Sequence, residues 1–268
     1  MNARTPSTIT LLKTVFGLGM VILLANGGST TALASETASS GLSAGQILQA
    51  TKDTYASLTS YGDEGRIVDA SGGVTTIFST VLARTNFYRI EWVAHDDSRN
   101  TFMGAGVQSV WSAGAGDFLN VGRGARWQQN REFALANAAS AGGVLVTTVP
   151  MAFFQVQWPD ALDDSAAEWV RAADERAGGN DCYVLLLASR GQTKTLWIGK
   201  QDFLVRQVQT VINYAAMRDS AASINAELAR RLHGFTLTET HTNIVVNHSV
   251  TRTDFVPSSP MNTPGASE

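Results

Sequence analysis

Alternating hydrophobic and polar positions dominate the middle of the chain, and they predict strands. From residue 65 the pattern has a period of two, and strand-like segments follow one another with Gly, Asn or Asp between them. The expected strands cover residues 65–70, 74–83, 86–95, 101–105, 107–112 and 117–121. Because no helical segment separates these strands, the spacing predicts an antiparallel meander.

The segment 87–94 shows how such a strand would present its two faces. One face carries mainly apolar side chains, namely Tyr88, Ile90, Trp92 and Ala94. The opposite face carries Phe87, Arg89 and Glu91. We therefore expect the first face to be buried and the second to be largely exposed to solvent.

Helical periodicity flanks and interrupts the meander. Ser43 is placed to cap a helix over 44–58, and the Ala-rich segment 128–141 reads as a helix that ends at Gly142. A short apolar stretch, 144–154, follows, and 215–232 reads as an inserted helix with an apolar stripe. Further strands are expected at 181–189, 192–199, 202–212 and 235–250.

The two ends of the chain have a different character. Residues 1–34 combine two basic residues, an apolar run over 15–25 and an Ala-Leu-Ala sequence at 32–34, the pattern of a cleavable secretory signal peptide. The apolar run is shorter than the ~20 residues of a spanning helix. We expect export to the periplasm, a small-residue linker over 35–43, and a disordered Ser- and Pro-rich tail over 258–268.

The charge argues against a nucleic-acid-binding protein, and the cysteine content excludes a fold held together by intramolecular disulfides. The net charge of −3 becomes −5 if the leader, with Arg4 and Lys13 and no acidic residue, is removed. Nucleic acid is therefore not an expected partner, since phosphate binding needs a clustered basic surface. Cys182 is the only cysteine, so no intramolecular disulfide can form, and its place in a strand favours an unreactive buried thiol.

The motifs for catalysis or metal binding all have a simpler structural interpretation. Residues 41–45 read G-L-S-A-G, but no strand precedes the serine as the nucleophile elbow requires, so a helix cap is favoured. His241 and His248 are seven apart on one expected strand and would point to opposite faces, which prevents a shared metal site. His95 and Asp96 are typical of a solvated turn. We expect no catalytic residues, no metal and no cofactor.

Four local strings resemble the LolA family of periplasmic outer-membrane lipoprotein carriers, which includes LolB and RseB relatives. Residues 84–88, R-T-N-F-Y, are similar to the family's R-P-N-x-F, and 110–120 resemble its V-S-D-G segment followed by an aromatic and Asn. Residues 195–206, T-L-W-I-G-K-Q-D-F-L-V-R, resemble its L-W-I-D strand pair, and 254–257 resemble the end of the domain. The departures are Thr85 in place of proline, serines at 258–259, and the 215–232 helix.

The resemblance implies an α+β fold over 44–257, in which an incomplete antiparallel β-barrel, a curved meander sheet, wraps over helices. In such a fold Arg84 would lie at the edge of an apolar cavity, with the 128–143 helix as a lid. The candidate lining residues are Tyr88, Ile90, Trp92 and Leu135. A tightly packed core in place of the cavity is the alternative.

Three functions follow from these features. The first is a non-catalytic periplasmic carrier that binds a lipidated or other hydrophobic ligand, such as lipoprotein acyl chains. The second is a sensor or accessory protein that uses the same fold to bind a periplasmic or membrane protein, as the LolA-like part of RseB does. The third is a hydrolase with dispersed acidic residues, which would show carboxylates that converge in a pocket with perturbed pKa values.

Overall fold

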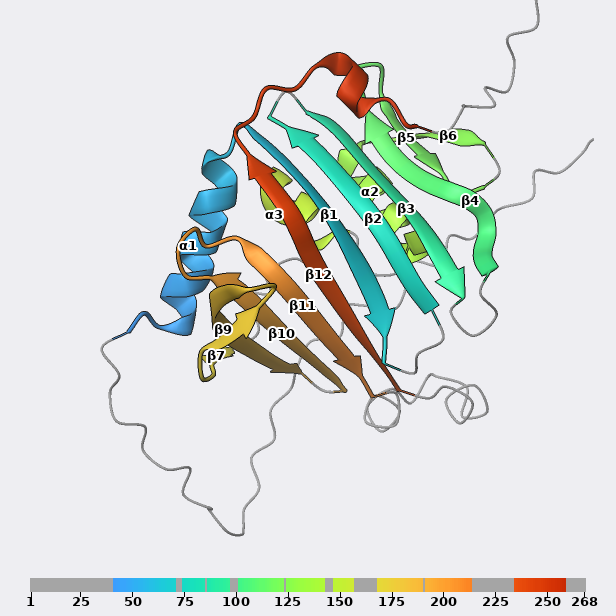
Figure 1. The fold of residues 1–268 in the computed structure, drawn as a ribbon. Helices are drawn as coiled ribbons and strands as arrows, with labels where there is room; N and C mark the ends of the chain where they lie inside the picture. The colour runs from blue at the N-terminus through green and yellow to red at the C-terminus, as the bar shows by residue number, and fades with distance from the viewer. Residues whose placement is uncertain are drawn as a thin grey trace, which may run out of the picture. The chain divides into compact units, whose positions relative to one another are not determined.

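An antiparallel sheet forms most of the structure. The computed structural model describes residues 41–70, 74–84, 86–96, 101–122, 124–142, 147–156, 168–189, 191–213 and 234–258. Within these ranges twelve strands belong to one sheet (Figure 1). The first six are β1 (Ser60–Asp69), β2 (Val74–Ala83), β3 (Phe87–Asp96), β4 (Thr101–Ser112), β5 (Asp117–Asn120) and β6 (Ala125–Gln128). The others are β7 (Trp169–Arg171), β8 (Glu175–Ala177), β9 (Asn180–Ser189), β10 (Gln192–Gly199), β11 (Val205–Ile212) and β12 (Phe235–Val246).

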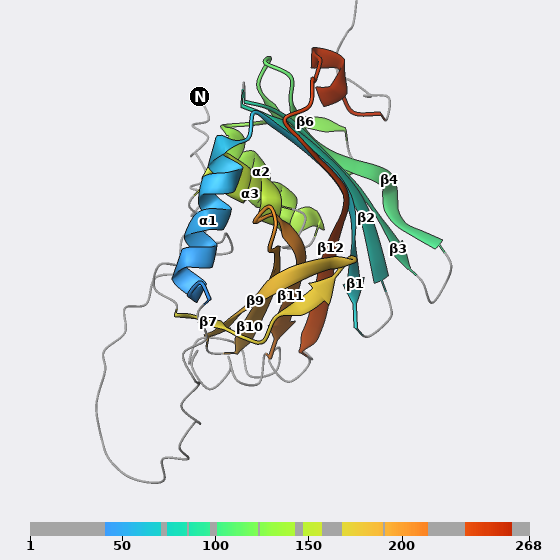
Figure 2. The ribbon, with the colours of Figure 1, turned by 60° about the vertical axis from the view of Figure 1, so that its left-hand side comes forward.

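Neighbours in the sheet are mostly neighbours in the chain. The order is β6-β5-β4-β3-β2-β1-β12-β11-β10-β9-β7, with β8 paired to β9. The β1–β12 pair joins the two halves of the meander, and its register matches Gly65 with His241. No pairing among the described strands connects β6 to β7, so the sheet is curved but open (Figure 2). The predicted fold class, an incomplete antiparallel barrel over helices, is confirmed.

The α-helices of the described residues lie on the concave side of this sheet, as Figure 2 shows. They are α1 (Ala44–Ser57), α2 (Arg131–Gly142) and α3 (Thr148–Phe154). α1 packs against α3 and β7, α2 against β4, β5 and β6, and α3 against β2. Their apolar side chains and the inner face of the sheet form one buried cluster. The core therefore lies between the helices and the sheet.

The start of α1 forms as the sequence predicts. Ser43 Oγ accepts a hydrogen bond from Gln46 N at 3.3 Å, and Gln46 Oε1 accepts one from Ser43 N at 2.8 Å. This reciprocal pair is a capping box, which satisfies two donors that a helix start leaves unpaired. Ile47, Leu48 and Tyr55 then face the core.

Several strand boundaries differ from those expected. β1 begins at Ser60 rather than at residue 65, and β4 runs unbroken over a stretch where two strands were expected. Gly106 lies within β4 and has a φ of 89°. A residue with a Cβ would adopt this φ only with strain, so glycine lets the strand continue through this position. The three-residue and four-residue strands β6, β7 and β8 were not predicted, because alternation over so few positions cannot be distinguished from a loop.

The outer face of β3 is less exposed than its polar residues suggested. Glu91 is only 7% exposed, and its Oε1 accepts hydrogen bonds from the backbone N and the Oγ of Ser258, each at 2.8 Å. Beside it, the 3-10 turn η1 (Arg252–Phe255) places Phe255 against Phe87, with ring centroids 5.5 Å apart. The C-terminal segment covers this face. The interpretation of Glu91 as a solvated residue was therefore wrong.

Some sequence-based expectations fall outside the described residues. These are the signal peptide over 1–34, the linker as far as residue 40, the inserted helix over 215–232 and the tail from 259 onwards. In the ranges that the structure does describe, no helix is both long enough and apolar enough to span a membrane.

Candidate functional site

The inner face of β3 carries three of the side chains predicted to line a cavity. Tyr88 and Ile90 are fully buried, and Trp92 is 2% exposed. Leu135 of α2 is also fully buried and belongs to the same hydrophobic cluster. The fold thus brings all four to the interior between the sheet and the helices. Because almost none of their surface is exposed, a ligand could reach them only after the helices move away from the sheet.

Arg84 lies in the turn between β2 and β3, beside the C-terminal end of α1. Its Nε donates to the carbonyl oxygen of Leu58 at 3.0 Å, and its Nη2 donates to the carbonyl oxygen of Tyr55. The guanidinium also lies over the ring of Phe153 in α3, 4.3 Å from the centroid. Carbonyls at the end of a helix lack partners within it, so a cation there is favourable. Arg84 thus links the sheet to both α1 and α3.

A second arginine makes similar contacts at the start of α2. Arg131 Nη1 donates to Asn86 Oδ1 at 2.6 Å, and its guanidinium lies over the ring of Phe154, 4.2 Å from the centroid. Burial, followed by the charge of Arg131, lowers the pKa of Arg84, so the two cations influence each other. Phe153 and Phe154 are in edge contact. Together the two arginines hold α3 against the β2–β3 turn.

Three ionisable side chains meet on the inner face where β1 pairs with β12. His241 Nδ1 lies 2.6 Å from Asp63 Oδ2, and His241 Nε2 lies 3.3 Å from Glu239 Oε1. The hydroxyl of Tyr61 donates to Asp63 Oδ2 at 2.8 Å. The side chains of Asp63, Glu239 and His241 are at most 1% exposed. We call these three residues the acidic–histidine cluster.

Strand alternation and one glycine position this cluster. Glu239 and His241 are two apart on β12 and therefore point to the same face. Gly65 pairs with His241, and a Cβ at Gly65 would overlap the Phe78 ring and the Thr240 carbonyl oxygen. Without that Cβ, the Phe78 and His241 rings meet edge to face with centroids 5.5 Å apart.

The surroundings raise two pKa values in the cluster. Burial lowers the pKa of His241, but Glu239 and Asp63 outweigh this effect and raise it to about 10. Burial raises the pKa of Glu239, and the contacts with His241 and Thr148 oppose that change. His241 is therefore an imidazolium at neutral pH, held between two carboxyl groups.

The cluster meets one condition of a hydrolytic site and fails another. Two carboxyl groups converge and one of them has a perturbed pKa, as the hydrolase alternative requires. The same groups are closed off from solvent, so a substrate has no access to them in this conformation. Among the described residues, no group of three or more His, Cys, Asp or Glu side chains is arranged to hold a metal ion. Cys182 is fully buried, as expected, and burial raises its pKa.

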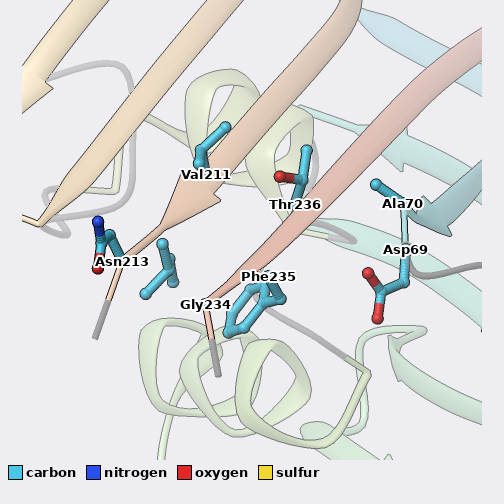
Figure 3. Close-up of a pocket in the computed structure, with 8 residues that line it drawn as sticks. Asp69, Ala70, Val211, Asn213, Gly234, Phe235 and Thr236 are labelled. Carbon is cyan, nitrogen blue, oxygen red and sulfur yellow. The ribbon is translucent and has the colours of Figure 1, made fainter. Parts of the chain in front are cut away.

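An open hollow lies at the far end of β1 from Arg84 (Figure 3). Its volume is about 550 Å³. Arg84 follows Ala83, which pairs with Ser60 at the start of β1, whereas Asp69 at the end of β1 lines the hollow. The other lining residues are Ala70, Val211, Ile212, Asn213, Gly234, Phe235 and Thr236.

Sequence reasoning named Arg84 and the inner face of β3 as candidates and did not point to the acidic–histidine cluster. A histidine and a glutamate two positions apart in a strand were the available signal for it. Asp63 could not be added from the sequence, because it lies 178 residues before His241. The contacts of Arg131 also had no sequence signal.

No protein-family model matches the chain, and no curated protein matches it. Solved structures similar to it include a domain from Vibrio parahaemolyticus assigned to outer membrane lipoprotein sorting, at 10% identity and a TM-score of 0.34, covering 78% of this chain and 94% of that one. LprF from Mycobacterium bovis has 10% identity and a TM-score of 0.37, covering 77% and 93%. A chain of the Pseudomonas aeruginosa MucA/MucB complex has 10% identity and a TM-score of 0.42, covering 79% and 59%. The likeness is one of fold.

Proposed function

We propose that this chain is a non-catalytic periplasmic carrier or binding protein for a lipidated or otherwise hydrophobic ligand. The observation that carries the proposal is the set of contacts made by Arg84, which joins the β2–β3 turn to α1 and α3. These contacts can break without disturbing the pairing of any strand. Arg84 would then act as a latch that keeps the helices closed over the apolar inner face while no ligand is bound.

The inner face offers enough apolar surface for such a ligand. Burial of an acyl chain contributes ~0.8 kcal/mol per methylene, so binding needs no covalent step. The acyl chain of the ligand would lie against Tyr88, Ile90 and Trp92. This position becomes accessible after α2, which carries Leu135, has moved. The leader sequence over 1–34 supports export to the periplasm.

The first test concerns ligand uptake and the movement of α2. Delipidated protein should bind a fluorescent fatty-acyl probe, and a disulfide engineered between α2 and β5, which pack together, should slow uptake by tenfold or more. Reduction of the disulfide should restore the rate. Each single-cysteine variant serves as a control. A wild-type protein that binds no probe would contradict the carrier proposal.

The second test concerns the latch. Arg84→Leu removes two charge-assisted hydrogen bonds to α1, each worth about 1.5–3 kcal/mol in a buried setting and less here because Arg84 is partly exposed. The open state should gain population, so we expect probe dissociation to slow by about tenfold, with a smaller change in the denaturation midpoint. Arg66→Leu, at an exposed position of β1, is the matched control. Equal dissociation rates in both variants would show that Arg84 is not a latch.

Binding of a protein partner is the second candidate, and one surface favours it. Trp127 is 66% exposed on β6, the strand at one end of the sheet order. An edge strand has unpaired backbone groups to which a strand of a partner can bind, and Trp127 would add an exposed aromatic contact there. Absence of acyl-probe binding, with intact folding, would favour this candidate over the carrier.

A further inference from the structure

The acidic–histidine cluster lies among apolar neighbours that offer its carboxyl groups no hydrogen bonds. On β12, Glu239 pairs with Ile67 of β1 on one side and with Val208 of β11 on the other, and both neighbours are buried. A carboxyl group in such a place costs free energy unless its charge and its oxygen atoms are satisfied.

Two carboxyl oxygens of the cluster accept no hydrogen bond, and a third is approached only by His241. Asp63 Oδ2 accepts from both Tyr61 and His241, but Asp63 Oδ1 accepts from no group. Glu239 Oε2 also accepts from no group, whereas Glu239 Oε1 forms an ion pair with His241 Nε2 at 3.3 Å. Glu239 is fully buried. Native structures rarely leave so many buried acceptors unpaired in one place.

The cluster also contains more carboxyl groups than cationic side chains. Asp63 and Glu239 share the single imidazole ring of His241. The cluster is therefore suited to a group that donates hydrogen bonds and carries positive charge.

We propose that the acidic–histidine cluster recognises the ammonium head group of an amphiphilic ligand whose hydrocarbon chain lies along the apolar inner face. This inference rests on the proposed carrier function. A primary ammonium has three N–H donors and no acceptor, so it can donate to Asp63 Oδ1 and Glu239 Oε2, which lack a hydrogen bond, while Glu239 Oε1 keeps its ion pair with His241. A carboxylate or phosphate head group would instead meet like charge in a medium of low dielectric constant.

The experiment compares three amphiphiles with the same twelve-carbon chain: dodecylammonium, dodecanol and laurate. Each displaces the fluorescent acyl probe from delipidated full-length protein at constant pH and salt. We expect dodecylammonium to bind at least tenfold more tightly than laurate, with dodecanol between them. Glu239→Gln, which keeps the shape of the side chain, should reduce this preference to about twofold or less.

Glu64→Gln is the matched control, because Glu64 is an exposed residue of β1 beside Asp63 and should leave the preference unchanged. Equal binding of the three amphiphiles by wild type would overturn the inference while leaving the carrier function intact. A preference that persists in folded Glu239→Gln would also overturn it. Failure of the acyl probe itself to bind would overturn the proposed function, and this inference with it. The wild-type comparison decides the matter even if Glu239→Gln does not fold.

Discussion

Trp92→Asp is expected to lower the free energy of unfolding by about 4 kcal/mol or more. Trp92 is 2% exposed within the cluster between β3 and the helices. Truncation of a buried tryptophan alone costs about 3–5 kcal/mol, and the new carboxylate would lie in an apolar core without a partner. Because domains are stable by about 5–15 kcal/mol, this loss removes a large fraction of the total stability. Urea denaturation followed by fluorescence and circular dichroism measures the change.

Ile77→Asp is the matched control for this prediction. Ile77 lies on β2 next to the buried Phe78, but its own side chain is 54% exposed on the outer face. The same substitution there should change the free energy of unfolding by about 0.5 kcal/mol. Glu91→Gln is unsuitable as a control, since Glu91 accepts two hydrogen bonds from Ser258. Equal denaturation midpoints for Trp92→Asp and Ile77→Asp would show that the register of β2 and β3 is wrong.

The second large effect is a loss of stability as pH rises above neutrality. The pKa of His241 is raised from its ordinary 6.5 to about 10, so between these values the folded protein keeps a proton that the unfolded chain has released. Stability from this group is complete below pH 6.5 and is lost as pH rises toward 10, at up to ~1.4 kcal/mol per pH unit. The raised pKa of Glu239 acts in the same direction. Urea midpoints measured from pH 6 to 10 test this slope.

His241→Gln should remove most of that slope. It should also cost about 3–5 kcal/mol at pH 7, because two buried carboxyl groups lose the cation between them. His248→Gln is the control, since His248 is partly exposed and contacts Ser60 Oγ at 3.4 Å. It should leave both the slope and the midpoint nearly unchanged. An unaltered slope in His241→Gln would assign the pH dependence to other groups.

Local patterns accounted for those parts of the fold that depend on neighbours in the chain. Ser43 and Gln46 lie within one turn of helix, so the start of α1 could be read directly. The alternation over β3 correctly placed Tyr88, Ile90 and Trp92 on one buried face. A family motif brought Arg84 to attention, but its partners on α1 and α3 appear in no local pattern.

By itself the sequence determined the antiparallel meander, the capped first helix and the side of β3 that is buried, because each depends on spacing within a few residues. The tertiary structure alone decided which distant residues meet. The β1–β12 pairing brings Asp63 to His241 and Glu239, and the C-terminal segment covers Glu91 on a face that alternation assigned to solvent. Contacts of this kind depend on strand order and on packing between elements, and a period along the chain carries no information about either.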